Sequence, residues 1–312
     1  MRHEFWPTGR RASLLRLGTS LTLLALLGAC GRGEQATYVP ELSARAGVGA
    51  PVYRVGVHPL HNPQRLMEVY GPIVEAIDAA LPEAELQLEA SRNYEEFERK
   101  LYAGEFDFAM PNPYQTLLAM RKGYRVIAKM GDDPDFRGLI LVRKDSGIQQ
   151  VQDLRGKAVA YPAATALAGT LMPQQFLQSQ GLDVNRDVQN LYVGSQESVI
   201  LNLLQGTVAA GATWTVPWRT FQTEQPEQAL RLEVKWRTPP LVNNGWVARQ
   251  DLPPALVRHF TDELTRLQDG EAGRQMLARV PVSAFVAASD ETYRPVQAFL
   301  TRFDRQVRPI EH

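Results

Sequence analysis

From residue 53 onward, short apolar segments alternate with longer stretches of helical periodicity, and this alternation most constrains the fold. In the first half of the chain, the predicted strands cover 53–57, 86–90, 106–110, 125–130 and 139–142, and the predicted helices cover 63–81, 94–103 and 114–122. The first helix places Leu66, Val69 and Ile73 on one face, which is the spacing of an amphipathic helix. Such alternation predicts an α/β layer fold with a mostly parallel sheet.

A second series of the same kind begins after Lys144. Its predicted strands cover 157–161, 191–193 and 209–213, and its predicted helices cover 165–180 and 197–205. We expect 232–236 to lead back, 246–248 to rejoin the first sheet, and helices at 254–268 and 292–307 to pack on it. A chain of 312 residues is long enough for two domains of ordinary size. The prediction is two lobes, one made of 51–143 and 240–312 and the other of 144–239.

Two long uncharged stretches, 158–182 and 198–218, have the length of membrane-spanning helices. They contain prolines and side-chain amides that would need partners in hydrocarbon, namely Pro162, Pro173, Gln174, Gln175, Gln178, Asn202 and Gln205. We therefore expect both stretches to form the buried interior of the second lobe.

The first 29 residues predict a secretory signal peptide. Four arginines precede an uncharged, leucine-rich stretch at 17–29 that ends in small residues. As a helix this stretch would rise only about 20 Å, whereas the hydrocarbon core of a bilayer is about 30 Å thick. A short membrane anchor is the alternative interpretation of the segment.

The residues Leu27, Gly28, Ala29 and Cys30 resemble the lipobox of bacterial lipoproteins, in which the cysteine becomes the acylated N-terminus. The resemblance implies that Cys30, the only cysteine, is a lipid attachment point. Residues 30–50 would then form a flexible tether. We expect a membrane-anchored protein of the periplasm or the cell surface.

Composition and motifs exclude several other classes of protein. The 34 basic and 34 acidic residues balance, so the chain lacks the positive charge on which nucleic-acid binding depends. One cysteine and five scattered histidines argue against a metal site, and we expect no cofactor. Because no Gly-x-Ser-x-Gly or Walker-type motif occurs in the sequence, we do not expect an enzyme.

Several short motifs, taken in order, resemble those of the periplasmic solute-binding proteins of ABC importers. They are 107–109 with Pro111 and Tyr114, 122–124, 135–142, 153–160, the turn at 194–195, and 205–208. More narrowly, 153–160 resembles a segment of the phosphonate/phosphite/phosphate-binding family. In that family the segment begins a strand, and the loop after the strand leads into a helix. The resemblance implies a type II periplasmic binding fold with two lobes and two hinge crossovers. It also implies a small oxyanion ligand, held by hinge closure, and membrane permease subunits as partners.

The chain departs from that family's pattern in the loop at 163–170. The family has a serine-rich loop there, whereas Thr165 and Thr170 are the only hydroxyl-bearing residues in this one. Gln196 and Glu197 stand where the family tends to have histidine, and Ala209 where it has aspartate. Backbone N–H groups at a helix start still bind an oxyanion without serines. The alternative is that small residues only let the helix pack against the sheet.

The candidate ligand-binding residues follow predicted strands, at the edge where open α/β sheets bind ligands. They are His58, Asn112, Tyr114, Thr165, Ala166, Thr170, Ser195, Gln196 and Trp214. Structural alternatives are a capped surface position beside Pro59 for His58, core packing for Tyr114 and Trp214, and helix capping for Ser195. Two other functions stay open: a two-lobed sensor that signals to a membrane kinase, and a periplasmic enzyme that uses the cleft.

Overall fold

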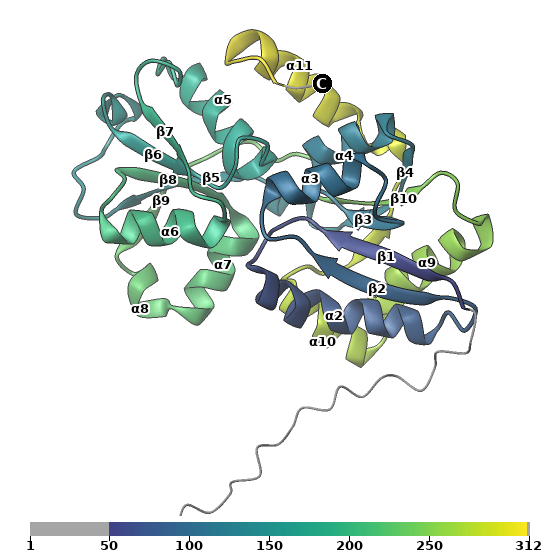
Figure 1. The fold of residues 1–312 in the computed structure, drawn as a ribbon. Helices are drawn as coiled ribbons and strands as arrows, with labels where there is room; N and C mark the ends of the chain where they lie inside the picture. Colours follow the sequence, from purple (N-terminus) through teal and green to yellow (C-terminus); the bar gives the residue numbers. More distant parts are fainter. Residues whose placement is uncertain (1–49, 311–312) are drawn as a thin grey trace, which may run out of the picture. The chain divides into compact units, whose positions relative to one another are not determined.

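The structure, a computed structural model, describes residues 50–310 and contains two β-sheets (Figure 1). The predicted signal peptide, Cys30 and nearly all of the predicted tether lie outside the described residues. The first sheet has the order β11-β4-β10-β3-β1-β2 and the second the order β7-β6-β8-β5-β9. The described part of the chain is therefore an α/β protein with two sheets, as the alternation predicts.

The first sheet combines parallel and antiparallel strands. Its strands are β1 (Val52–Val57), β2 (Glu85–Ala90), β3 (Phe108–Met110), β4 (Tyr124–Met130), β10 (Gly245–Arg249) and β11 (Phe285–Ala287). β1 pairs in parallel with β2 and β3, whereas β10 runs antiparallel to β3 and β4. The expectation of a mostly parallel sheet is wrong here, because β10 returns from the second sheet and enters in the opposite direction.

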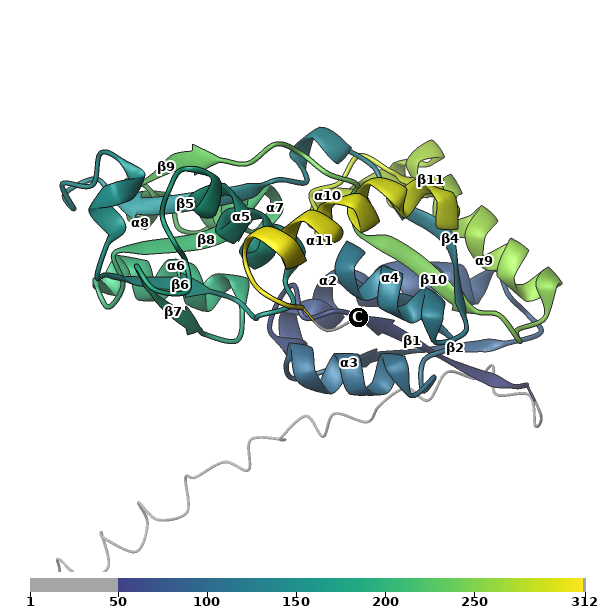
Figure 2. The ribbon, with the colours of Figure 1, turned by 90° about the horizontal axis from the view of Figure 1, so that it is seen from above.

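Six helices cover the two faces of the first sheet. They are α2 (Pro63–Ala79), α3 (Tyr94–Tyr102), α4 (Pro113–Arg121), α9 (Pro254–Arg266), α10 (Glu271–Arg279) and α11 (Arg294–Gln306). Figures 1 and 2 show α3 and α4 on one face and α2, α9 and α10 on the other. On that second face, the ring of Phe260 in α9 stacks on Phe108 of β3, with 4.1 Å between the ring centroids.

The second sheet is covered in the same way. Its strands are β5 (Gly138–Arg143), β6 (Ala158–Tyr161), β7 (Gln189–Tyr192), β8 (Ala210–Trp214) and β9 (Leu232–Arg237), and its helices are α5 (Met172–Ser179), α6 (Gln196–Gln205), α7 (Thr215–Glu224) and α8 (Pro226–Ala229). Successive side chains of a strand point to opposite faces. Accordingly, Leu139 and Leu141 pack with α6, and Ile140 and Val142 belong to the larger core cluster.

The chain passes between the two sheets twice, through 131–137 and 238–244. These passages agree with the fold that the resemblance implies. However, β5 pairs with β8 and β9 of the second sheet, whereas the predicted first lobe extends to residue 143. An isolated apolar strand gives no sign of the sheet that it joins, since sheet membership depends on contacts distant in sequence.

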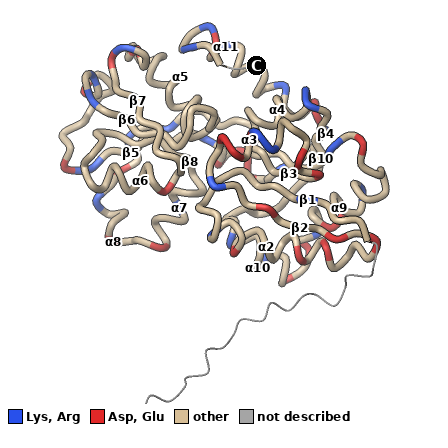
Figure 3. The backbone as a smooth tube through the Cα atoms, in the orientation of Figure 1, with Lys and Arg blue, Asp and Glu red and all other residues tan. Residues whose placement is uncertain are grey.

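The two uncharged stretches are broken into short elements inside the second sheet and its helices. β6 and β8 carry no charged residue, and Figure 3 shows charges mainly on helices and connecting segments. The helix predicted at 165–180 begins two residues later, as a π turn over Leu167–Leu171 that continues into α5. Within residues 50–310, none of the helices has the length and hydropathy needed to cross a bilayer.

Candidate functional site

A small cavity lies between residues of the two sheets, and we call it the inner cavity. It is lined by His58, Tyr94, Asn112, Phe136, Ala166, Leu167, Ala168, Gly169, Gln196, Trp214 and Asn244. Its free volume is about 10 Å³, roughly the room that one water molecule needs. These lining residues include no Lys, Arg, Asp or Glu.

The inner cavity forms where the carboxyl ends of parallel strands meet. His58 directly follows β1, and Asn112 stands two residues after β3, so the parallel pairing of these strands brings both to one edge. Ala166 follows β6 and Trp214 ends β8, which lie side by side in the second sheet. Ligands bind at this edge of open α/β sheets, since side chains and helix starts converge there.

Three residues at the start of the helix that follows β6, Leu167, Ala168 and Gly169, line the cavity. The first intrahelical bonds run from the N–H groups of Thr170 and Leu171 to the carbonyl of Ala166. The N–H groups of Leu167, Ala168 and Gly169 form the first turn, where a helix offers no acceptor of its own. The helix continues through α5 to Ser179, and its dipole adds positive potential at this end.

The side-chain amide of Gln196 lies against the same turn. The Oε1 atom of Gln196 accepts a hydrogen bond from Thr213 Oγ1 at 2.8 Å, and the Gln196 side chain is also hydrogen-bonded to Tyr94. A Cβ atom at Gly169 would lie 2.9 Å from Gln196 Nε2 and 2.7 Å from Pro162 Cγ. Only glycine at position 169 lets these groups approach so closely.

His58 is buried against the first sheet. Its Nδ1 atom lies 2.8 Å from the carbonyl oxygen of Met110, and its ring meets Tyr94 edge-on, with 6.2 Å between the ring centroids. Desolvation by burial lowers the pKa of His58 to about 4, although the bond to Met110 opposes this shift. The imidazole is therefore neutral at pH 7. Burial also raises the pKa of Tyr94, so its hydroxyl keeps its proton.

Asn112 links the two sides of the cavity. Its Oδ1 accepts from the N–H groups of Tyr114 and Gln115 and so caps α4. Its Nδ2 donates to the carbonyl of Thr165 at 3.2 Å. The Thr165 hydroxyl donates in turn to Glu98 of α3 at 2.5 Å. Asn112 and Thr165 thus hold the start of the 167–179 helix against α3 and α4.

The structure brings five of the nine candidate residues to the cavity wall: His58, Asn112, Ala166, Gln196 and Trp214. The other four lie outside the described lining. Tyr114 is buried in α4, and the Thr170 hydroxyl donates to the carbonyl of Ala163 at 2.7 Å. The capping interpretation of Ser195 is confirmed, because its Oγ accepts from the N–H of Ser198 at 3.1 Å.

Sequence reasoning missed several residues of the wall. Tyr94 stands four residues after β2, which runs parallel to β1, so its place after a strand end could have identified it. Phe136 and Asn244 lie on the two passages between the sheets, where no periodicity marks them. Phe136 meets Trp214 edge-on, with 5.3 Å between ring centroids, and the two rings form the apolar part of the wall.

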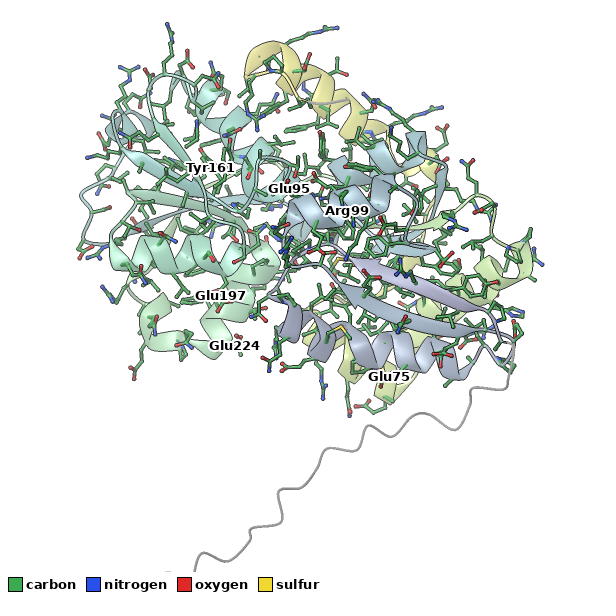
Figure 4. All side chains as sticks on the ribbon, viewed as in Figure 1. Glu75, Glu95, Arg99, Tyr161, Glu197 and Glu224 are labelled. Atoms are coloured by element: carbon green, nitrogen blue, oxygen red, sulfur yellow. The ribbon has the colours of Figure 1, made fainter. Side chains whose placement is uncertain are left out.

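A larger groove, which we call the outer groove, adjoins the inner cavity and shares Gln196 with it. One side is lined by Leu60, His61, Asn62, Gln64, Arg65 and Glu68, and the other by Gln196, Glu197, Ile200, Pro217, Thr220, Phe221, Glu224 and Gln225. Its volume is about 330 Å³. Arg65 on α2 and Glu224 on α7 form an ion pair across it at 2.9 Å, and Figure 4 labels Glu197 and Glu224.

Comparison with known proteins finds substrate-binding proteins of ABC transporters. A family model described as "ABC transporter, phosphonate, periplasmic substrate-binding protein" matches residues 55–293. The probable ABC transporter phosphite binding protein PhnD1 of Prochlorococcus marinus (strain MIT 9301) is 25% identical over 185 residues, which are 55% of this chain and 62% of the relative. The matched region is thus less than two thirds of that curated relative.

Solved structures share the fold. PhnD1 from Prochlorococcus marinus (MIT 9301), in complex with methylphosphonate, has a TM-score of 0.75 at 20% identity and covers 82% of this chain and 100% of its own. A binding protein of an ABC phosphonate transporter from Pseudomonas aeruginosa has a TM-score of 0.76 at 18% identity, over 83% and 88%. The aliphatic sulphonate binding protein SsuA of Escherichia coli has a TM-score of 0.56 at 16% identity, over 81% and 86%.

Proposed function

Because this chain belongs to the family of periplasmic substrate-binding proteins of phosphonate ABC transporters, we propose that it binds a small phosphorus oxyanion in the inner cavity and presents it to a membrane permease. The family match spans most of the described residues and confirms the resemblance seen in the sequence. Proteins of such a family bind and deliver a solute without transforming it. Their periplasmic place implies an extracytoplasmic location for this chain.

The observation that carries the proposal is the helix start at the cavity wall. Leu167, Ala168 and Gly169, which form the first turn of this helix, line the inner cavity together with Gln196. Hydrogen-bond donors at a helix N-terminus favour an anion with several oxygens. His58 and Tyr94 stand among the lining residues contributed by the first sheet and its helices, so an oxyanion there would contact both sides.

The wall also narrows the chemistry of the solute. An ammonium group on the ligand would need an acidic partner, and the described lining residues include neither Asp nor Glu. Phe136 and Trp214 instead favour a short apolar substituent or none. The chemistry of this wall therefore favours phosphite, phosphate or a small alkylphosphonate.

Binding requires the two sides of the cavity to separate and close. A free volume of about 10 Å³ is too small for a phosphonate to enter without such motion. The two passages at 131–137 and 238–244 are the natural hinges. We place the lobes at 51–137 with 240–312 and at 138–239, and the ligand favours the closed form because it contacts both.

A lipid at Cys30 would keep the protein near its permease. We expect Cys30→Ser to move the protein from the membrane fraction to the soluble periplasmic fraction. Immunoblotting of the two fractions measures this. A variant that stays with the membrane in wild-type amounts would favour the short membrane anchor instead.

The main test is a ligand screen by thermal unfolding of the purified protein. Ligands of the native state raise its stability by mass action. At 100 times its dissociation constant, a ligand should raise the melting temperature by about 5 to 10 °C. We expect this shift with phosphite, phosphate or methylphosphonate.

The matched non-phosphorus solutes in the screen are methanesulfonate, sulfate and acetate. A shift with these alone would reject a phosphorus oxyanion as the ligand. The absence of any shift with the phosphorus compounds, confirmed by titration calorimetry, would contradict the proposal as a whole.

A further inference from the structure

The imidazole of His58 presents a hydrogen-bond acceptor at the inner cavity. Its Nδ1 atom lies 2.8 Å from the carbonyl oxygen of Met110, and a carbonyl oxygen can only accept. Nδ1 therefore carries the ring proton. In a neutral imidazole the other nitrogen, Nε2, then has a lone pair and no proton. No described residue makes a hydrogen bond to Nε2.

The surroundings keep this imidazole neutral. His58 is 2% exposed, and burial lowers its pKa to about 4. Burial and Arg65 likewise lower the pKa of His61 to about 4, and a proton on either of the two imidazoles disfavours a proton on the other. On α3, which packs against the ring, Tyr94 keeps its proton and Glu98 accepts bonds from Thr165 and Gln115.

A second acceptor lies in the same wall. The side chain of Asn244 is 1% exposed, and its Nδ2 group lies 3.3 Å from the sulfur of Met130. Its Oδ1 atom is buried and has no hydrogen-bond partner among the described residues. A buried acceptor without a donor costs free energy, so the two acceptors favour a ligand that brings a donor of its own.

The remaining groups of the cavity favour a single negative charge. The groups that can donate are neutral: the backbone N–H groups at 167–169, and the amide of Gln196 and the hydroxyl of Tyr94, which are hydrogen-bonded to each other. No lysine or arginine is found among the described lining residues. Two negative charges buried without a cation are much more costly than one.

We propose that the cavity selects an oxyanion that carries one charge and retains one acidic O–H group, and that this O–H donates to Nε2 of His58. The inference rests on the proposed function and specifies the protonation state of its ligand. A hydrogen phosphonate and hydrogen phosphite each have one charge and one O–H group, and dihydrogen phosphate has one charge and a second O–H group besides. An alkylsulfonate has the same tetrahedral shape and single charge, but its three oxygens are all acceptors.

The acceptor thus discriminates between phosphonates and sulfonates, two classes that proteins of this fold bind. In a sulfonate complex an anionic oxygen would face the lone pair of Nε2 and leave both acceptors unpaired. A site built to bind a ligand O–H rejects an analogue that lacks it, because buried polar groups are then left without partners.

The test compares methylphosphonate with methanesulfonate by titration calorimetry at pH 6. We expect methanesulfonate to bind at least tenfold more weakly. Raising the pH to 9 removes the second proton of methylphosphonate, and we expect its affinity to fall by at least tenfold. The affinity for methanesulfonate should change little over the same range.

His58→Gln supplies the matching variant, because a glutamine amide turns to offer either a donor or an acceptor. We expect the ratio of the two affinities to fall at least fivefold in His58→Gln. His61→Gln makes the same substitution in the outer groove and should leave the ratio unchanged. Circular dichroism spectra establish that both variants are folded.

Equal affinities of the wild-type protein for the two ligands would overturn this inference while leaving an oxyanion-binding function standing. Tighter binding of methylphosphonate at pH 9 than at pH 6 would also overturn it, because the dianion would then be the preferred form. Binding of neither ligand, nor of phosphite or phosphate, would overturn both this inference and the proposed function.

Discussion

The burial of His58 makes the stability of the fold depend on pH. The unfolded chain binds a proton at His58 below its ordinary pKa of 6.5, whereas the native chain binds one only near pH 4. The contribution of His58 to stability is therefore fully present above pH 6.5. It is lost as the pH falls toward 4, because protonation then favours the unfolded chain.

We expect the wild-type protein to lose about 2 kcal/mol more of its free energy of unfolding than His58→Gln when the pH falls from 7 to 5. Urea unfolding of both proteins at the two pH values measures the difference. The comparison cancels the contribution of other titrating groups, including His61. Equal losses in the two proteins would mean that His58 is not held neutral in the native state.

Some cavity residues follow from their position in the sequence and others do not. His58, Asn112 and Trp214 stand at the ends of apolar strands, and the general behaviour of α/β sheets predicts where such residues lie. Asn244 stands outside any periodic segment. Its place in the wall depends on the path that the chain takes between the sheets, and no local sequence pattern predicts that path.

At the level of elements, Asn112 has two roles at the start of α4. Asn112 caps the helix through Oδ1 and donates through Nδ2 to the carbonyl of Thr165 near the other side of the cavity. Asn93 caps α3 in the same way, accepting from the N–H of Glu96 at 2.9 Å. Both asparagines thus stabilise a helix, but only Asn112 also makes a contact across the cavity. Comparing variants of the two distinguishes these effects.

We expect Asn112→Ala and Asn93→Ala each to lower the free energy of unfolding by about 1 to 2 kcal/mol, because each loses a cap. Only Asn112→Ala should also weaken oxyanion binding, by about threefold to tenfold, since it also loses one hydrogen bond to Thr165. Chemical unfolding and titration calorimetry measure the two effects. An equal loss of binding in both variants would remove the special role of Asn112.

The element boundaries show what a single sequence predicts well. The strands at β1, β4 and β8 lie close to their predicted positions, because each is an apolar run of the right length. The sequence did not predict that β5 and β10 pair antiparallel with their neighbours. Each of these strands follows a passage from the other sheet, and that passage sets its direction. Local composition contains no information about the path of the chain between the sheets.

At the scale of the whole molecule, the C-terminal segment makes a third link between the sheets. Figure 2 shows α11 extending from α4 toward α5. Beyond α11, Arg308 donates to the side chain of Gln174 at 3.2 Å and to the carbonyl of Ala164 at 3.0 Å. The Asn185 side chain donates to the carbonyl of Val307 at 2.6 Å. The segment thus supports the loop that leads to the 167–179 helix.

We expect Arg308→Ala to weaken oxyanion binding by about threefold to tenfold, because it releases that loop through the loss of two hydrogen bonds. Arg305→Ala, on the exposed side of α11, is the matched control and should bind as the wild type does. Titration calorimetry gives both affinities. Unchanged binding in Arg308→Ala would show that the loop holds its shape without the C-terminal segment.

Trp214 gives the molecule an optical reporter of its own. Its indole lies in the cavity wall beside Phe136, whereas the other described tryptophans, Trp218, Trp236 and Trp246, are absent from that wall. An oxyanion that binds beside the indole changes the polarity around Trp214, whereas the emission of the other tryptophans stays constant. Occupancy can therefore be followed in real time by ultraviolet emission, without attaching a dye.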